Sequence, residues 1–250
     1  MLFSLLILLH PLTMARESPK TTTTHLPPFT LSSPPGTDIW RKPPTHNAFN
    51  ASIHPSTPNP IPLSTFSRAK ISFTLPPAPQ LRQYDQAGLL LHLTQPGLSA
   101  NQTKWIKTGI EFYYGKPYVA TVGCDAWADW SLVPMGEFGS FSTTPTASTS
   151  TTIPTTTPDD QPGATVEIRR EQDELGKSLW IYWLVRDGQG AEVERRPLRE
   201  VTWVLDGEEE WDVSVSGYVC RPTKAGGEGE LEAVFAEGLE VEASGVGGKE

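Results

Sequence analysis

The ten residues Lys104-Trp-Ile-Lys-Thr-Gly-Ile-Glu-Phe-Tyr113 alternate between side chains suited to a core and side chains suited to a surface. Successive side chains of a β-strand point to opposite faces of a sheet, so this alternation predicts a strand with one buried face. The residues expected in the core are Ile106, Ile110 and Phe112. The opposite face would carry Trp105, Lys107, Gly109, Glu111 and Tyr113. The stretch therefore predicts a strand of a β-sandwich with a polar face turned outward.

Strand signals continue on both sides of this stretch. Gln86–Thr94 holds four leucines and a single His92, which indicates a strand covered on both faces. Tyr114–Pro117 predicts a hairpin turn into a strand at Tyr118–Val122. Further strands are predicted at Phe66–Leu75, Ala164–Arg170, Leu179–Val185, Leu198–Leu205, Val213–Cys220 and Leu231–Val241. No window of about 11 residues has the period of a helix, so the chain is expected to be all-β, as a sandwich or a barrel.

Composition supports an all-β chain and excludes several classes of protein. Proline and glycine together make up 45 of the 250 residues, a share that argues for many turns and against a helical bundle. The two cysteines, Cys124 and Cys220, are too few for a disulfide framework and are expected as small core residues. The net charge of −9 makes nucleic acid an unsuitable partner. Asp206–Glu250 holds 12 acidic and 3 basic residues, which predicts a solvated acidic edge or a surface for a basic partner.

The domain organisation follows from shifts in composition. Leu2–Leu9 is an apolar run of eight residues, too short to span a bilayer, which needs about 20. Residues 1–15 are therefore either a cleaved signal peptide or a disordered extension of a cytosolic protein that starts at Met14, and sequons at Asn50 and Asn101 fit secretion. Residues 140–162 contain 17 Ser, Thr or Pro in 23 positions, which predicts a disordered insertion. A single β-sandwich domain is expected over 28–243, with a tail at 244–250.

Sequence motifs of catalysis are absent. The chain has no G-x-S-x-G, H-E-x-x-H, C-x-x-C or P-loop pattern, so no cofactor and no metal is expected. Glycoside hydrolysis is the reaction to test in a β-sandwich, and it needs two carboxyl groups about 5–5.5 Å or about 6.5–9.5 Å apart. The E-x-D-x-x-E strand pattern of jelly-roll glucanases fails here, because Glu171-Gln172-Asp173 would need its last acid at Gly176.

Polar and aromatic residues nevertheless gather in three segments, which are Tyr84-Asp85-Gln86, the strand around Lys107 and Glu111, and Cys124–Ser131. The last segment sets two indoles beside two carboxylates, a combination that suits stacking on sugar rings, although tryptophan in a sandwich also fills the core. Lys107 and Glu111 lie about 13 Å apart along one strand, so each needs a partner on a neighbouring strand. The candidate ligand-binding residues are Asp85, Gln86, His92, Lys107, Glu111, Asp129, Trp130 and Ser131.

Five strings in this order resemble the fungal regulation-of-enolase protein family: Phe29–Pro44, Tyr84–Leu91, Lys104–Phe112, Asp129–Ser131 and Pro197–Trp203. The resemblance covers most of 29–241. It implies a concanavalin-A-like jelly-roll β-sandwich of two antiparallel sheets, no established catalytic activity and a link to the control of enolase. A more remote similarity joins the chain to sandwich domains of some β-xylosidases, which share the Gln-Ala-Gly strand and the following Lys-x-Gly-x-Glu strand.

The leading hypothesis is a non-catalytic sandwich that binds a carbohydrate-like or other small ligand, or a partner protein such as enolase. The binding surface would be a concave sheet carrying Gln86, His92, Lys107 and Glu111. A glycoside hydrolase using Glu111 with Asp85 or Asp129 is the alternative, and a purely structural sandwich is the third reading. The family resemblance implies a cytoplasmic location, and cleavage of residues 1–15 would imply a secreted one.

Overall fold

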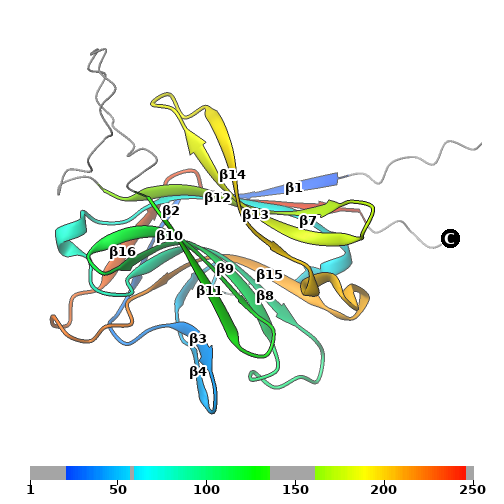
Figure 1. Cartoon of the computed structure of the whole chain (residues 1–250), viewed down its shortest axis with the longest axis horizontal. Coiled ribbons are helices and arrows are strands. Elements are labelled where there is room, and N and C mark those ends of the chain that lie inside the picture. Colours follow the sequence, from blue (N-terminus) through cyan, green and yellow to red (C-terminus); the bar gives the residue numbers. More distant parts are fainter. Residues whose placement is uncertain (1–20, 57–58, 136–160, 246–250) are drawn as a thin grey trace, which may run out of the picture.

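A computed structural model describes residues 21–56, 59–135 and 161–245. The predicted leader at 1–15 and nearly all of the predicted insertion at 140–162 fall outside these ranges. The described residues form two antiparallel sheets packed face to face, with a small hairpin against one of them (Figure 1). Within these ranges the helical segments are short 3-10 turns, and no helix is long and apolar enough to cross a membrane. The predicted all-β sandwich of two antiparallel sheets is therefore confirmed.

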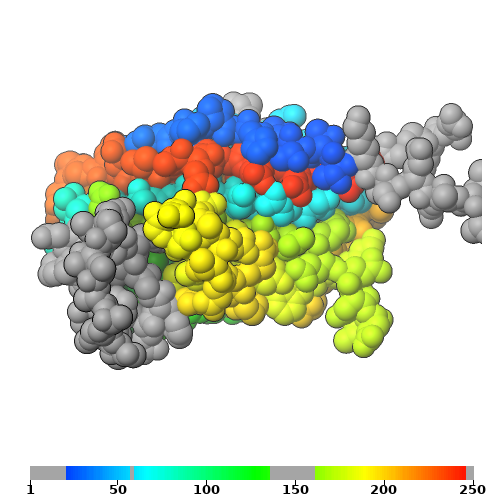
Figure 2. Space-filling view, turned by 90° about the horizontal axis from the view of Figure 1, so that it is seen from above, coloured from blue at the N-terminus to red at the C-terminus, as the bar shows by residue number. Residues whose placement is uncertain are grey.

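The larger sheet has eight strands, with β1-β17-β7-β12-β13-β14 in order and β16 and β2 joined beside β7. Their bounds are β1 (Thr21–Leu26), β2 (Phe29–Ser33), β7 (Phe66–Thr74), β12 (Gly163–Gln172), β13 (Lys177–Arg186), β14 (Glu192–Val201), β16 (Leu231–Phe235) and β17 (Leu239–Ser244). β1 pairs with β17, so the first and last strands lie side by side, as the neighbouring blue and red bands of Figure 2 show.

The smaller sheet has seven strands, in the order β11-β10-β9-β8-β15-β5, with β6 also paired to β15. Their bounds are β5 (Ser52–His54), β6 (Ile61–Pro62), β8 (Gln86–Thr94), β9 (Lys104–Tyr113), β10 (Lys116–Cys124), β11 (Ala128–Pro134) and β15 (Asp212–Cys220). The separate hairpin consists of β3 (Ile39–Lys42) and β4 (His46–Phe49). The 3-10 turns are η1 (Leu63–Thr65), η2 (Ala78–Gln80), η3 (Trp203–Leu205) and η4 (Glu208–Glu210).

Most predicted strands are confirmed, and two of the predicted segments differ from the structure. β8 and β9 have the predicted bounds at both ends. The segment Leu231–Val241 is two strands, β16 and β17, because the chain turns at Gly238, where φ is 72°. The segment Leu198–Leu205 holds the end of β14 and then η3, and β14 itself starts at Glu192. β1 adds a strand before the predicted domain boundary at 28, because its exposed Thr-rich edge has no apolar alternation to reveal it.

The main core lies between the two sheets. Ile106, Ile110 and Phe112 of β9 are buried there, as predicted, against residues of the larger sheet such as Ile71, Val166 and Trp183. A second core lies on the other face of the smaller sheet, under the β3–β4 hairpin. Its buried members are Ile39, Leu90, Trp105, Val122, Cys124, Tyr218 and Cys220. Both cysteines are free and buried, which confirms their predicted role as small core residues.

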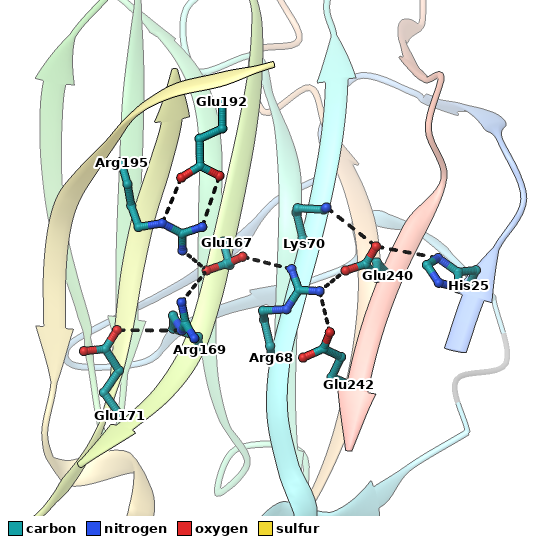
Figure 3. A network of polar contacts seen from close by, with 10 residues as sticks. All are labelled: His25, Arg68, Lys70, Glu167, Arg169, Glu171, Glu192, Arg195, Glu240 and Glu242. Atoms are coloured by element: carbon teal, nitrogen blue, oxygen red, sulfur yellow. Dashed lines mark hydrogen bonds and ion pairs between the residues drawn. The ribbon is translucent and has the colours of Figure 1, made fainter. Parts of the chain in front are cut away.

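The outer face of the larger sheet carries a network of ion pairs across several strands (Figure 3). Its centre is Glu167 on β12, a residue only 1% exposed, which contacts Arg68 on β7 and Arg195 on β14. Arg68 also pairs with Glu240 and Glu242 on β17. Two acids of the C-terminal acidic stretch are therefore neutralised within the sheet instead of being free for a basic partner.

Candidate functional site

The outward face of β9 sets the frame of the site. Antiparallel pairing places Gln86 of β8 on one side of Glu111 and Tyr118 of β10 on the other. Two positions away, Gly88 pairs with Gly109, and a Cβ atom built on Gly109 would lie 2.0 Å from the carbonyl oxygen of Ala87. Only glycine fits this close approach of the two strands, which leaves a low point on the face beside Glu111.

A buried polar cluster lies next to this low point. Lys107 Nζ donates a hydrogen bond of 2.6 Å to Gln86 Oε1 and is 3.8 Å from Asp38 Oδ1. Asp38, just before β3, also accepts hydrogen bonds from the Ile39 amide at 2.8 Å and from Gln86 Nε2 at 3.5 Å. Lys107 and Gln86 are each 2% exposed. Because their charges and hydrogen bonds are satisfied internally, these side chains support the site from below.

The Lys107 ammonium is further stabilised by aromatic rings. It lies 5.8 Å from the ring centroid of Trp105 and 5.9 Å from that of Tyr218. Both rings are fully or nearly fully buried, so these cation–π contacts act in a region that water does not reach. The predicted partnership between Lys107 and a residue of the neighbouring strand is confirmed, with Gln86 as that residue.

Glu111 differs from its neighbours because its carboxyl group is buried without a hydrogen bond of ordinary geometry from any described residue. The residue is 6% exposed. Burial raises the pKa of Glu111 to about 7, and the positive charge of Lys107 opposes that rise in pKa. The nearby indole of Trp130 also favours the ionised carboxylate, yet its buried Nε1 makes no hydrogen bond at normal distance and angle. A buried acceptor and a buried donor thus lie beside each other without a hydrogen bond of ordinary geometry between them.

Aromatic rings lie beside Glu111 and form a surface that we call the aromatic rim. The Tyr113 ring centroid lies 4.3 Å from that of Tyr114, 5.7 Å from that of Tyr84 and 5.2 Å from that of Trp130. The rim consists of Trp40, Tyr84, Tyr113, Tyr114, Tyr118 and Trp130, which are linked by ring contacts. These side chains come from the β3–β4 hairpin, the loop before β8 and the strands β9, β10 and β11.

The rings of Tyr113 and Trp130 meet although their backbones are far apart. In the register of β9, β10 and β11 they are six positions apart, about 20 Å along a flat strand. Gly109 and Ala120 lie between them on the same face and have almost no side chain, so the two rings can lean together above them. Their planes meet at 83°, an edge-to-face contact. The low point at Gly109 therefore has an aromatic cover beside Glu111.

Two rim tyrosines occupy strained backbone positions. Tyr84 has φ 70° and Tyr114 has φ 46°, and they are the non-glycine residues with positive φ in the described ranges. A bulky side chain in this region costs about 1–3 kcal/mol. Tyr114 and Gly115 form a two-residue hairpin turn with positive φ at both positions, where Asn-Gly would be preferred. The chain keeps two exposed aromatic rings at the rim in spite of this cost.

Three predicted site residues lie away from Glu111. The buried Asp85 carboxylate accepts hydrogen bonds from Arg221 at 3.0 and 2.7 Å and from the Arg82 amide at 2.8 Å. Asp129 and Ser131 flank Trp130 on β11, so their side chains point to the opposite face. Asp129 is 3.8 Å from Arg199, and Ser131 donates to the Thr121 carbonyl at 3.5 Å. The structure therefore separates both predicted catalytic partners, Asp85 and Asp129, from Glu111.

His92 lies on the same face of the smaller sheet, but under the hairpin. Its ring centroid is 4.5 Å from that of Phe49 on β4. Burial, together with the positive charge of Arg41, lowers the pKa of His92 to about 4. The imidazole is therefore neutral at physiological pH and packs as part of the second core. Of the predicted residues, the structure brings together Gln86, Lys107, Glu111 and Trp130.

The β3–β4 hairpin supplies two site residues that the sequence did not predict, Asp38 and Trp40. Arg41 anchors the hairpin, because its Nη1 donates to the Thr103 carbonyl at 3.0 Å and its Nη2 to the Ala100 carbonyl at 3.3 Å. The hairpin fills the hollow that was expected above Lys107. The hairpin leaves the aromatic rim beside Glu111 uncovered, together with part of Asp38, whose side chain is 25% exposed.

No metal centre accompanies these residues in the ranges 21–56, 59–135 and 161–245, where no group of His, Cys, Asp and Glu has the geometry to hold an ion. The chemistry that the site offers is stacking, hydrogen bonding and exchange of a proton near neutral pH. The Glu111 carboxyl group is protonated below about pH 7 and can then donate a hydrogen bond. Above that pH it is ionised and can only accept hydrogen bonds.

Comparisons with known proteins place the chain among fungal and structural relatives. It is 40% identical over 200 residues to an uncharacterized protein of Emericella nidulans, over 80% of each chain. A functionally unknown protein from Saccharomyces cerevisiae has a solved structure similar to this fold, with a TM-score of 0.51, 16% identity and coverage of 91% of this chain and 97% of that one. A glycoside hydrolase family protein from Mycobacterium thermorestibile is similar at a TM-score of 0.38 and 9% identity, over 85% of this chain and 76% of that one. A family model matches residues 16–237, and the chain therefore belongs to the family described as protein of unknown function DUF1349.

Proposed function

We propose that this protein binds a carbohydrate-like ligand, without catalysis, on the aromatic rim and Glu111. The observation that carries the proposal is a cluster of six aromatic side chains beside the buried carboxyl group of Glu111, in which Tyr84 and Tyr114 are exposed and held in strained backbone. Aromatic faces stack on the C–H faces of sugar rings. The Glu111 carboxyl and the Trp130 N–H, which makes no hydrogen bond of normal geometry, can both bind sugar hydroxyl groups.

Glycoside hydrolysis is the second candidate, and one observation favours it. Glu111 and Asp38 both lie beside Lys107, and the charge of Asp38 contributes to the raised pKa of Glu111. This pair would replace Asp85 or Asp129 as the partner of Glu111 in the acid–base roles. Release of shorter sugars from an oligosaccharide, detected by chromatography and abolished in Glu111→Gln, would support hydrolysis over binding alone.

A partner protein is the remaining alternative, and it rests on the resemblance to the regulation-of-enolase family. This alternative implies a cytoplasmic location, whereas binding of an extracellular glycan would require secretion of the protein. Binding of purified enolase to the full chain, measured by biolayer interferometry and lost in rim variants, would favour this alternative. Enolase binding that persists in rim variants would place the partner elsewhere on the molecule.

The test of the carbohydrate proposal is a glycan array followed by calorimetric titration of the best ligand. Trp130→Ala is expected to raise the Kd at least about tenfold, which corresponds to about 1.4 kcal/mol of lost stacking and hydrogen bonding. Trp180→Ala is the matched control, because Trp180 stacks on Tyr182 at 6.0 Å in the other sheet, away from the rim. An unchanged Kd in Trp130→Ala, or an array without any bound glycan, would refute the proposal.

A second variant protects this test against misfolding of Trp130→Ala. Tyr114 is 78% exposed and lies in a turn, so Tyr114→Ala should keep the fold and can only lower affinity through the lost ring. Near-ultraviolet circular dichroism and thermal melts of each variant identify any loss of packing. Weakened binding in both rim variants, with intact melts, is the expected result.

A further inference from the structure

The polar groups that stay free at the proposed site are mainly acceptors. The Lys107 ammonium is already bound to Gln86 and Asp38, so the site keeps no free cation there. Glu111 offers carboxyl oxygens beside the Trp130 indole, and Asp38 offers Oδ2, since Oδ1 takes the hydrogen bonds from Ile39 and Gln86. A ligand must therefore bring hydrogen-bond donors or a positive charge to this site.

Three basic side chains of the smaller sheet and the hairpin are committed elsewhere. Lys104 pairs with Asp125 at 2.7 Å, Arg41 donates to loop carbonyl groups, and Arg221 is bound to Asp85. The exposed Lys116 lies at the outer edge of the rim, as the register partner of Tyr113. Next to Glu111 and Asp38, a sugar that carries carboxylate, sulfate or phosphate would meet two carboxyl groups and a lysine already bound to Gln86 and Asp38. The site thus disfavours acidic saccharides and favours cationic ones.

The aromatic rim adds a second attraction for a cation. The Trp130 ring lies at 83° to Tyr113 and at 80° to Trp40, so ring faces point in several directions around Glu111. The faces of Trp and Tyr attract ammonium groups within about 6 Å, most strongly where water is excluded. The protein already uses this chemistry for Lys107 over Trp105.

Resting on the proposed carbohydrate site, we propose that the ligand is an amino sugar, with its ammonium group bound by the Glu111 carboxylate and the rings of Tyr113 and Trp130. The sugar rings would stack on the exposed tyrosines of the rim. The amine is thus the group by which the protein would distinguish this ligand from other saccharides with the same backbone.

Proton exchange accompanies this mode of binding. Glu111 has a pKa raised to about 7, so below that pH it is mostly protonated in the free protein and must lose its proton to pair with an ammonium group. At pH 6 this corresponds to about 0.9 proton released for each ligand bound. The titratable groups that face Glu111 are Lys107, Asp38, Tyr113, Tyr218 and Cys220. Lys107 is bound to Asp38, and burial raises the pKa of Tyr218 and of Cys220 far above this range, so Glu111 is the group that titrates there.

The test uses three hexasaccharides with the same β-1,4 backbone that differ at carbon 2: cellohexaose, the N-acetylglucosamine hexamer and the glucosamine hexamer. Calorimetric titrations of the full chain at pH 6.0, where the sugar amine is protonated, are expected to show the glucosamine hexamer binding at least about tenfold more tightly than cellohexaose. Repeating the titration in two buffers of different ionisation enthalpy measures the released proton. Glu111→Gln should abolish the proton release and bring the ratio of the two affinities close to one. Glu174→Gln, an exposed acid in the turn between β12 and β13, is the matched control and should keep both.

Each outcome separates this inference from the proposed function. If cellohexaose or the N-acetylglucosamine hexamer binds in a Trp130-dependent manner with equal or higher affinity than the glucosamine hexamer, the carbohydrate site stands and the amino-sugar inference is overturned. If none of the three hexamers and no glycan of the array binds, both fall. Tight binding of the glucosamine hexamer without proton release would place its amine away from Glu111 and also overturn the inference.

Discussion

Replacing Glu111 with glutamine should stabilise the protein at alkaline pH while removing a group of the proposed site. The pKa of Glu111 is raised from 4.5 to about 7, so between these values the folded chain holds a proton that the unfolded chain has lost. Stability therefore falls as the pH rises through this window, and above about pH 7 the whole cost of the buried charge remains. Glutamine has nearly the same shape and cannot ionise.

The size of the effect follows from the linkage between proton binding and folding. A difference of one unit between the pKa values in the folded and unfolded states corresponds to about 1.4 kcal/mol. Burial of the Glu111 carboxylate therefore lowers the free energy of unfolding by on the order of 3 kcal/mol at pH 8 and by about 1 kcal/mol at pH 5. Glu111→Gln should therefore exceed the wild type in unfolding free energy by about 2 kcal/mol more at pH 8 than at pH 5. The free energy is measured by urea unfolding followed by tryptophan fluorescence.

Comparing variant with wild type at each pH cancels the titration of every other group. A gain in unfolding free energy that is the same at pH 5 and pH 8 would show that the carboxyl group is not a buried titrating acid, and the reasoning about the site would fail with it. Ile110→Asp is a useful companion, because Ile110 is the next residue on β9, points into the main core and is fully buried. That variant should not fold, whereas equal stability of the two variants would contradict the assigned faces.

Three further predictions test other parts of the structure. The pKa of His92 is lowered from 6.5 to about 4, so the unfolded chain binds a proton that the folded chain does not, and the wild type loses stability as the pH falls through that range. His92→Phe should remove this loss, seen as a smaller difference between its thermal melts at pH 5 and pH 7.5. Asp85→Ala leaves the buried Arg221 without its counter-charge and should cost about 3–5 kcal/mol in urea unfolding, and a cost below about 1 kcal/mol would contradict the buried pair. Gly109→Ala places a Cβ 2.0 Å from a carbonyl oxygen and should lower the melting temperature strongly, while Gly188→Ala, with open space around it, should not.

Much of the sandwich could be predicted from alternation because its central strands have one face in a dry core. β8 and β9 were bounded correctly, since the apolar and polar positions change sharply at Gln86, Thr94, Lys104 and Tyr113. Alternation does not mark the end of a strand where the turn itself begins and ends with small or apolar residues, as at Ala236–Gly238. The sequence therefore predicted one strand where the structure has β16 and β17. Alternation is also absent from an exposed edge strand such as β1, because neither face of that strand needs apolar residues for burial.

The site was only partly predictable, because two of its residues come from a segment distant in the chain. Lys107, Glu111 and Gln86 follow from the register of two adjacent strands, which sequence alternation fixes. Asp38 and Trp40 join them only because the β3–β4 hairpin folds back over the sheet, and its Pro-rich surroundings carry no periodic signal of that contact. Sequence also could not separate Trp130, which is half-buried at the edge of the second core, from Trp105, which is fully buried within it, since the same residue type serves both environments.

The pairing of β1 with β17 has a practical consequence for handling this protein. Thr21 and Ser244 are direct partners at the edge of the larger sheet, so the two ends of the sandwich lie about 5 Å apart, and the aromatic rim belongs to the other sheet. An affinity tag or a sensor surface attached near either end therefore leaves the rim open to added glycans. The same closeness allows a short linker to join the ends into a circular permutant whose new termini open in the Asp187–Gly190 turn, away from the rim.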